Sequence, residues 1–286
     1  MGIEGTVAWV DGRLRDPAEP VLAALDHGVT VGDGVFETCG VVHGQAFALT
    51  RHLRRLRHSA VGIGLPEPDE DLLRDAVAEV LAAGTGLGRL RITVTAGIGP
   101  LGSGRIPGPA TVLVLAGRAS PPDVVRVVRV PWVRNERSAV AGLKTTSYVE
   151  NAVVLAHAQA RGADEALLAN TVGELCEGTG TNVFVETGGE VLTPPLSSGC
   201  LGGITRELVL EWGADAGLPV REAQPGELPY AVLDDVAAGR AHLGLTGSVR
   251  TVAPVVALDG APVTQGSLVA ELRRLYAARE PQDLDP

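Results

Sequence analysis

Gly142-Leu143-Lys144-Thr145-Thr146-Ser147-Tyr148 contains Lys144, the only lysine among the 286 residues of the chain. The other 23 side chains in the lysine and arginine total are all arginine. Guanidinium stays protonated at physiological pH, so an arginine cannot replace an amine that must lose its proton. A single retained lysine therefore indicates chemistry at Lys144, as an imine-forming amine, a nucleophile or a general base.

The composition excludes several classes of protein. The length of 286 residues predicts one large or two medium domains, and 45% apolar with 20% charged residues is typical of a soluble globular enzyme. The formal charge of −10 argues against nucleic acid and anionic membranes as partners. Three cysteines without CxxC spacing indicate neither a disulfide framework nor a metal site. No apolar run approaches ~20 residues, so we expect a cytoplasmic protein with no membrane partner.

The first half of the chain predicts a small mixed α/β unit. A hairpin with Asp11-Gly12 at its turn precedes a glycine-rich stretch at 26–38. Apolar periodicity then predicts amphipathic helices, and runs of Val, Ile and Thr predict strands. The expected strands are 35–42, 89–96, 110–116 and 124–130, and the expected helices are 50–63 and 69–83. An irregular glycine and proline loop occupies 97–109, and Pro121-Pro122 is the candidate domain boundary.

The second half predicts a further set of strands and helices. Helices are expected at 148–161, 205–216 and 267–279, and strands at 165–169, 174–176, 182–186 and 190–193. Residues 241–257 are expected as strand interrupted at Thr246-Gly247-Ser248. We expect the tail after Glu280 to be frayed, because chain ends without anchoring contacts usually are.

Three segments of this second half suit one ligand. Gly202-Gly203-Ile204-Thr205 places glycines directly before a helix, where free backbone N–H groups and a hydroxyl can hold a phosphate. Thr246-Gly247-Ser248 offers a second hydroxyl-bearing turn, and Glu177 is a carboxylate in a glycine-rich turn. An amine, a phosphate cradle and a carboxylate for a protonated ring nitrogen are together what pyridoxal 5′-phosphate (PLP) needs. No GxGxxG follows a strand and opens a helix, which excludes a dinucleotide fold.

With these motifs in order, the chain resembles the class IV, or fold type IV, PLP enzymes from about residue 5 to about residue 260. This family includes D-amino acid and branched-chain aminotransferases, (R)-selective amine transaminases and 4-amino-4-deoxychorismate lyases. The motifs that carry the resemblance are Gly32-Asp33-Gly34-Val35-Phe36-Glu37, His52-Leu53-Arg54-Arg55-Leu56, the lysine segment, Glu177-Gly178 with Asn182-Val183-Phe184, Thr193-Pro194-Pro195-Leu196, and Gly203-Ile204-Thr205-Arg206.

The resemblance implies a role for each matching residue. Lys144 would form the imine with the cofactor and move the proton during catalysis. Glu177 would pair with the pyridine nitrogen. The cofactor phosphate would be bound by Arg55, Gly203, Ile204, Thr205 and Ser248. Tyr148 would reach the phenolic oxygen, although it stands four rather than five residues after the lysine.

The resemblance also implies the architecture. We expect a mixed α/β fold with a small N-terminal domain, 1–120, and a larger C-terminal PLP-binding domain, 121–286, with a β-barrel-like core. The cofactor would lie in the cleft between the two domains. A homodimer would form, in which a loop of each partner closes the other active site.

Substrate-binding residues differ among members of such a family. Ala96-Gly97 replaces the Arg-Gly common at the end of this strand, and Phe36 replaces a tyrosine of some D-amino acid enzymes, so the usual trap for the substrate carboxylate is missing. Arginines at 89, 91, 105 and 250 are the alternatives, with Arg250 ranked first and equally compatible with a surface arginine. The candidate substrate-binding residues are Phe36, Thr38, Arg91, Val249 and Arg250.

The favoured activity is transamination between D-amino acids and 2-keto acids, extending to (R)-primary amines, because an absent carboxylate trap permits looser specificity. Gly99-Pro100-Leu101-Gly102-Ser103 and the lysine segment look most like aminodeoxychorismate lyases, which release pyruvate, and the cofactor residues do not distinguish the two activities. A branched-chain L-amino acid aminotransferase is a further alternative. Retention of Lys144, Glu177, Arg55 and Thr205 weighs against a non-catalytic PLP carrier.

Overall fold

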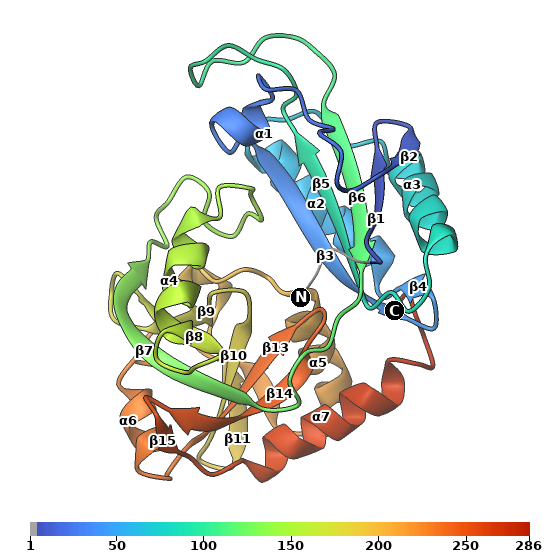
Figure 1. Cartoon of the computed structure of the whole chain (residues 1–286). Helices are drawn as coiled ribbons and strands as arrows, with labels where there is room; N and C mark the ends of the chain where they lie inside the picture. The colour runs from blue at the N-terminus through green and yellow to red at the C-terminus, as the bar shows by residue number, and fades with distance from the viewer. Residues whose placement is uncertain (1–4) are drawn as a thin grey trace. The chain divides into compact units, whose positions relative to one another are not determined.

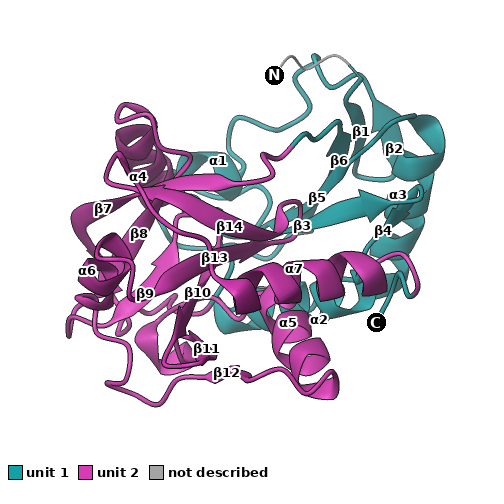
Figure 2. Ribbon diagram, turned by 90° about the horizontal axis from the view of Figure 1, so that it is seen from below, with its two compact units in different colours: residues 1–120, 143–148, 283–286 teal, residues 121–142, 149–282 magenta. Residues whose placement is uncertain are grey.

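The computed structural model describes residues 5–286, whose contacts divide the chain into two compact units (Figure 2). Among the described residues, unit 1 comprises 5–120, 143–148 and 283–286, and unit 2 comprises 121–142 and 149–282. The change of unit after Ser120 coincides with the boundary expected at Pro121-Pro122. The lysine segment and the last four residues, however, pack with unit 1 although they lie far along the chain.

Unit 1 is built on a six-stranded antiparallel sheet with the order β2-β1-β6-β5-β3-β4 (Figure 1). The hairpin turn Asp11-Gly12 has φ angles of +43° and +94°, which the aspartate-glycine pair accommodates as predicted. The strands are β1 (Val7–Val10), β2 (Arg13–Arg15), β3 (Gly34–Val42), β4 (Gln45–Ala46), β5 (Arg89–Thr95) and β6 (Thr111–Gly117).

Two helices, α2 (Leu49–Gly62) and α3 (Glu70–Ala83), cover one face of this sheet. On α2 the buried residues Leu53, Leu56 and Ala60 recur at helical spacing and join the strands in one apolar core. Asp69 caps α3 by accepting a hydrogen bond from the Leu72 N–H at 3.1 Å. Both helices were predicted to within one residue at each end. A short helix, α1 (His27–Thr30), was not predicted, because its glycine-rich sequence indicates only turns.

Unit 2 is built on a curled nine-stranded sheet with the order β12-β11-β10-β13-β14-β7-β8-β9, and β15 pairs with β14 beside this path. Parallel pairs join β7 to β8 and β14, and β11 to β12, so the sheet is mixed. The strands are β7 (Val125–Arg134), β8 (Glu165–Asn170), β9 (Leu175–Gly178), β10 (Asn182–Thr187), β11 (Glu190–Thr193), β12 (Val220–Glu222), β13 (His242–Gly247), β14 (Thr251–Leu258) and β15 (Ala261–Pro262).

The helices of unit 2 are α4 (Val149–Gln159), η1 (Leu196–Ser198), α5 (Ile204–Asp215), α6 (Val232–Ala237) and α7 (Ser267–Arg279). The helix α7 has the predicted bounds, and α5 is shifted by one residue. The sequence patterns missed α6, β12 and β15, which are too short to show a period. Arg129 of β7 forms ion pairs with Asp234 of α6 and with Asp259.

The prediction of a frayed tail is wrong, because the last residues cap α2. Ala48, the residue before this helix, has no polar side chain that could cap it. The Ala48 N–H instead donates to the Leu284 carbonyl at 2.8 Å, and the Thr50 N–H donates to the Asp285 carboxylate at 2.8 Å. Free N–H groups at a helix start need acceptors, and the tail supplies them. Among residues 5–286, moreover, no helix has the length and apolarity that a membrane crossing requires.

Candidate active site

The lysine segment lies along the start of β3. The Phe36 N–H donates to the Lys144 carbonyl at 3.0 Å, and the Thr146 N–H donates to the Gly34 carbonyl at 2.8 Å. The Lys144 N–H donates to the Ser59 hydroxyl of α2 at 3.1 Å. The lysine backbone is therefore fixed to both a strand and a helix of unit 1.

The two faces of β3 carry different side chains, because successive residues of a strand point to opposite sides. Val35 and Cys39 lie in the apolar core under the helices. Phe36 and Thr38 lie on the other face, opposite Thr93 and Arg91 of β5. The lysine amine is on this second face, with Nζ 4.4 Å from the centre of the Phe36 ring.

Arg91, Thr93 and Tyr148 cluster with Phe36 on that second face. The Arg91 guanidinium lies 3.7 Å from the centre of the Phe36 ring, and its Nε donates to the Thr93 hydroxyl at 3.1 Å. The Tyr148 ring meets the Phe36 ring edge-on at 5.2 Å. Burial lowers the pKa of Arg91. Arg91 forms no ion pair with any residue between 5 and 286, so a ligand carboxylate would find a cation there without a competing anion.

Arg55 on α2 binds the buried carboxylate of Glu37, which was not among the site residues predicted from the sequence. Its Nε and Nη2 donate to the two oxygens of Glu37, each at 2.7 Å, and His52 Nδ1 lies 2.6 Å from the same carboxylate. Burial favours a higher pKa for Glu37, but Arg55 and His52 outweigh it and hold the pKa well below its ordinary value. Glu37 therefore fixes the direction of Arg55, the predicted phosphate ligand.

In unit 2, Glu177 on β9 is buried, and each of its oxygens has a partner. Arg134 Nε of β7 donates to Oε1 at 3.0 Å, and the Leu201 N–H donates to Oε2 at 2.9 Å. Arg134 is itself held by Asn151 at 2.8 Å. Glu177 is one of the residues indicated by the sequence. Arg134 and Leu201 are not, because no spacing in the sequence connects them to Glu177. A cation beside this carboxylate favours its charged form, as the predicted partner of a protonated ring nitrogen requires.

The start of α5 is shaped for a close approach. A Cβ at Gly203 would lie 2.0 Å from the Asn182 Oδ1, so glycine is required at this position. Asn182 also donates from Nδ2 to the Leu201 carbonyl at 2.8 Å. Gly203, the residue before α5, has no side chain that could cap the helix, so the first N–H groups of α5 suit an anionic ligand. The Thr205 hydroxyl bonds to Tyr276, so the Thr205 backbone is the group that suits a phosphate.

The turn at Thr246-Gly247-Ser248 adds a hydroxyl beside the start of α5. Thr246 is opposite Asn182 in the β10–β13 pair. Its side chain is buried, and among residues 5–286 its Oγ1 has no hydrogen-bond partner. Ser248, the residue chosen from the sequence, is partly exposed in the turn that follows. A buried hydroxyl needs a partner, and a phosphate oxygen would provide one.

Comparisons with known proteins place this geometry in a family. The family model "Amino-transferase class IV" matches residues 34–258, which include the lysine segment, Glu177 and the start of α5. The chain belongs to the class IV amino-transferases. This family is PLP-dependent, and the chain is an enzyme of that class.

Relatives of this class IV amino-transferase have several activities in their names. A putative branched-chain-amino-acid aminotransferase of Methanocaldococcus jannaschii is 29% identical over 94% of both chains. A bifunctional aminodeoxychorismate lyase / D-amino acid transaminase of Mycobacterium tuberculosis is 31% identical, over 72% of this chain and 77% of its own. A fold IV-transaminase structure from Curtobacterium pusillum has a TM-score of 0.80 at 32% identity, covering 95% of this chain and 93% of its own. The predicted fold class is confirmed.

The residues of the class IV amino-transferase fit its cofactor. The uncapped start of α5 and the orphan Thr246 hydroxyl form a cradle for a phosphate, and Glu177 offers a carboxylate held in its charged form. Bound PLP supplies an aldehyde that combines with amines and a ring that accepts electrons from the substrate carbon. The candidate cofactor-binding residues of unit 1 are Arg55, Lys144 and Tyr148, and those of unit 2 are Glu177, Gly203, Ile204, Thr205, Thr246 and Ser248.

Arg250 and Val249, the other predicted substrate residues of this amino-transferase, follow the Ser248 turn. Arg250 is half-buried, and its Nη1 is buried without a hydrogen-bond partner within the part of the chain described. Asp164 is its anionic neighbour: Arg126 mainly, and Arg250 to a smaller extent, lower the Asp164 pKa. Arg250 thus has a carboxylate of its own chain nearby, whereas Arg91 has no ion-pair partner among residues 5–286.

Proposed function

We propose that this class IV amino-transferase transfers an amino group between D-amino acids and 2-keto acids, with PLP attached to Lys144. The observation that carries the proposal is Arg91, a partly buried cation without an anionic partner in the described chain, on the same aromatic ring as the lysine amine. The family pattern has an arginine where this chain has Ala96, and Arg91 of β5 is the candidate that binds the substrate carboxylate in its place. The relative named for D-amino acid transamination supports the choice of stereochemistry.

The roles of the cofactor residues follow from their chemistry. Lys144 would bind the cofactor aldehyde and then move a proton between the substrate carbon and the cofactor. Glu177 would bind the ring nitrogen, while Arg55, α5 and the Thr246 turn would bind the phosphate. Phe36 would form one wall beside the reacting amine, with Thr38, Val249 and Arg250 contributing to the substrate contacts. (R)-Primary amines would react at the same position without using the carboxylate partner.

A stopped half-reaction tests this function. Holoenzyme is mixed in turn with D-alanine, L-leucine, (R)-1-phenylethylamine and aminodeoxychorismate, without a keto-acid acceptor. We expect conversion to the pyridoxamine form with D-alanine and, more slowly, with the (R)-amine. Conversion with L-leucine alone would identify a branched-chain aminotransferase and reject the proposal.

The second candidate is an aminodeoxychorismate lyase. The relative whose name combines the lyase with D-amino acid transamination favours it, and so does the resemblance of the loop at 99–103. The half-reaction separates the two activities. Pyruvate released from aminodeoxychorismate with regeneration of the starting absorbance would establish the lyase.

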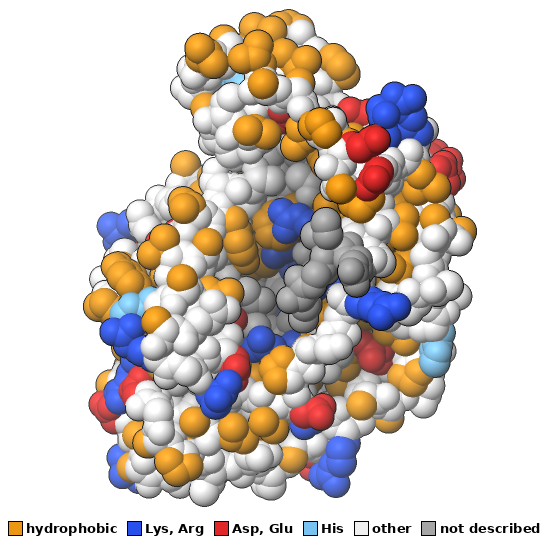
Figure 3. All heavy atoms as spheres, in the orientation of Figure 1, with side chains coloured by type: hydrophobic (Ala, Val, Ile, Leu, Met, Phe, Trp, Pro, Cys, Tyr) orange, Lys and Arg blue, Asp and Glu red, His pale blue; other side chains and the backbone are white. Residues whose placement is uncertain are grey.

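We also propose that the enzyme is a homodimer. The loop between β5 and β6 in unit 1 exposes Ile98, Leu101 and Ile106, with 81% of Leu101 accessible. Orange side chains gather over this loop in Figure 3. Exposed apolar surface of this kind marks contact sites between proteins. Light scattering after gel filtration should give twice the mass of one chain, and a monomer at micromolar concentration would contradict the proposal.

A further inference from the structure

The turn at Gly32-Asp33-Gly34 holds the lysine segment through its backbone. The Gly32 carbonyl accepts from the hydroxyls of Thr146 at 2.8 Å and Ser147 at 3.0 Å. The Gly34 carbonyl accepts from the Thr146 N–H at 2.8 Å. The positions of the residues that follow Lys144 therefore depend on the conformation of this turn.

Glycine is required on both sides of Asp33. Gly32 has a φ of +69°, and a Cβ there would lie 2.8 Å from the Ser147 hydroxyl. A Cβ at Gly34 would lie 2.8 Å from the Val94 carbonyl. Glycines permit this close packing but give the turn little conformational restraint of its own. Asp33 is the only residue of the turn with a side chain that can restrain it.

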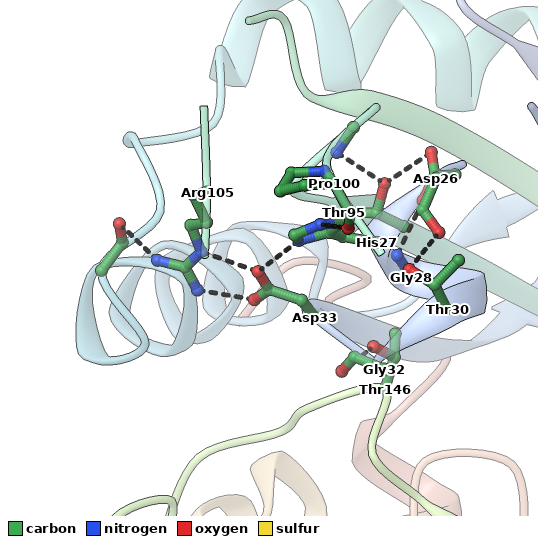
Figure 4. A network of polar contacts seen from close by, with 12 residues as sticks. Asp26, His27, Gly28, Thr30, Gly32, Asp33, Thr95, Pro100, Arg105 and Thr146 are labelled. Carbon is green, nitrogen blue, oxygen red and sulfur yellow. Dashed lines mark hydrogen bonds and ion pairs between the residues drawn. The ribbon is translucent and has the colours of Figure 1, made fainter. Parts of the chain in front are cut away.

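The Asp33 side chain points away from the lysine segment, toward the loop between β5 and β6 (Figure 4). Arg105 of that loop donates from Nε and Nη2 to the two oxygens of Asp33, at 2.7 and 2.6 Å. Its Nη1 donates to the Gly64 carbonyl at 3.0 Å. Hydrogen bonds from Arg105 lower the pKa of Asp33, so the carboxylate is charged at neutral pH. Bidentate arginine–carboxylate pairs are the geometrically specific kind.

The same loop is fitted to the α1 region. His27 Nε2 lies 2.9 Å from the Pro100 carbonyl, and a Cβ at Gly99 would lie 2.1 Å from that nitrogen. The Gly99 N–H donates to the Leu25 carbonyl at 3.0 Å. His27 Nδ1 also lies 3.6 Å from Asp33 Oδ2. The first part of the loop is thus anchored by His27, and its last part by Arg105.

We propose that Asp33 and Arg105 are positioning residues for Lys144. Their ion pair holds the glycine-flanked turn, and the turn holds the backbone that follows the lysine. The ion pair and the turn consequently couple the loop between β5 and β6 to Lys144. Displacement of the loop therefore changes the position of the lysine amine. The inference rests on the proposed function in one respect: Lys144 is the residue to which PLP is attached.

The experiment compares D33N with wild-type holoenzyme and with E67Q. Asp33→Asn keeps the size of the side chain and removes the charge that holds Arg105. Glu67→Gln is the matched control, because it breaks another arginine–carboxylate pair of unit 1, Arg57–Glu67 at 2.8 Å. Both partners of that pair are exposed, and their ion pair involves neither the turn nor the lysine segment.

Two measurements are made on each holoprotein. The first is tryptic cleavage after Arg105, mapped by mass spectrometry, which should accelerate about tenfold in D33N as the released guanidinium becomes available to the protease. The second is the midpoint of the pH titration of the cofactor's visible absorbance, which reports the linkage to Lys144. We expect this midpoint to move by about half a pH unit in D33N. E67Q should leave both unchanged.

Several results would overturn the proposal. Faster cleavage with an unchanged midpoint would show that Asp33 holds only the loop, and an equal midpoint shift in E67Q would show a general effect of lost charge. R105M removes the other partner of the same ion pair and should shift the midpoint as D33N does. This variant tests the proposal if D33N does not fold. Retention of the wild-type titration in K144A would instead reject the proposed function, and that outcome is distinct from the others.

Discussion

The two faces of the unit 1 sheet differ in whether their charged side chains are paired. On the helix-covered face, Glu37 is buried but paired with Arg55 and His52. On the other face, Arg91 is partly buried against Phe36 near the lysine amine and has no carboxylate partner within the described chain. Buried charges normally require compensation, so the satisfied face contributes to stability and the uncompensated one is prepared for a ligand. The contrast predicts which substitutions will reduce activity and which will reduce stability.

The largest effect is expected on the ligand-binding face. Lys144→Ala should lower the transamination rate by about 10²–10⁴-fold or more, because it removes the proposed proton carrier as well as the cofactor linkage. The free energy of unfolding without cofactor should change by less than about 1 kcal/mol. Reduction with borohydride followed by mass spectrometry checks the linkage, and a borohydride-stable cofactor adduct in K144A would contradict the assignment.

On the helix-covered face, Glu37→Gln should destabilise unit 1 by about 3 kcal/mol, because it leaves Arg55 and His52 beside a neutral amide. Urea unfolding without cofactor measures this change. PLP affinity should also fall, since Arg55 loses the partner that directs it. If E37Q has wild-type stability and impaired catalysis alone, the distinction between the two faces does not hold.

The same carboxylate predicts a pH dependence. Arg55 and His52 hold the folded-state pKa of Glu37 below its ordinary value of about 4.3. A lowered folded-state pKa means that Glu37 contributes stability above about pH 4.3, and that this contribution is lost as the pH falls toward the folded-state pKa. The stability difference between wild type and E37Q should therefore narrow below about pH 4. A constant difference from pH 7 to pH 3 would exclude Glu37 as the source.

A smaller and more selective effect is expected at Arg91. Arg91→Leu should raise KM for D-alanine by about 10- to 100-fold, the loss expected for a hydrogen bond to a charged group. Reaction with (R)-1-phenylethylamine, which has no carboxylate, should change by less than about threefold. Arg91→Lys is the matched control that keeps the charge and should recover part of the loss. Equal losses for both substrates would remove Arg91 from carboxylate binding.

Sequence patterns were sufficient where a signal was local. The helix α7 follows from its apolar period, and the choice of Glu177 as a candidate residue rests on its glycine-rich turn. Partners that meet through the fold were not predictable: Arg134 lies 43 residues before Glu177, and Glu37 lies 18 residues before Arg55. The sequence indicated Ser248, and preferring Thr246 needed the structure, because only burial distinguishes the two hydroxyls. The residues were recognisable, but their pairing depended on the fold.

The tail that caps α2 has a consequence for how the chain acquires its structure during synthesis. Thr50 and Asp285, which bond at the start of α2, are separated by 235 positions. Asp285 is synthesised after all of unit 2, so α2 waits through the synthesis of that unit for the acceptor of its first N–H groups. This helix carries Arg55 and also Ser59, whose hydroxyl holds the Lys144 backbone. Unit 1 is thus begun before unit 2 and completed after it.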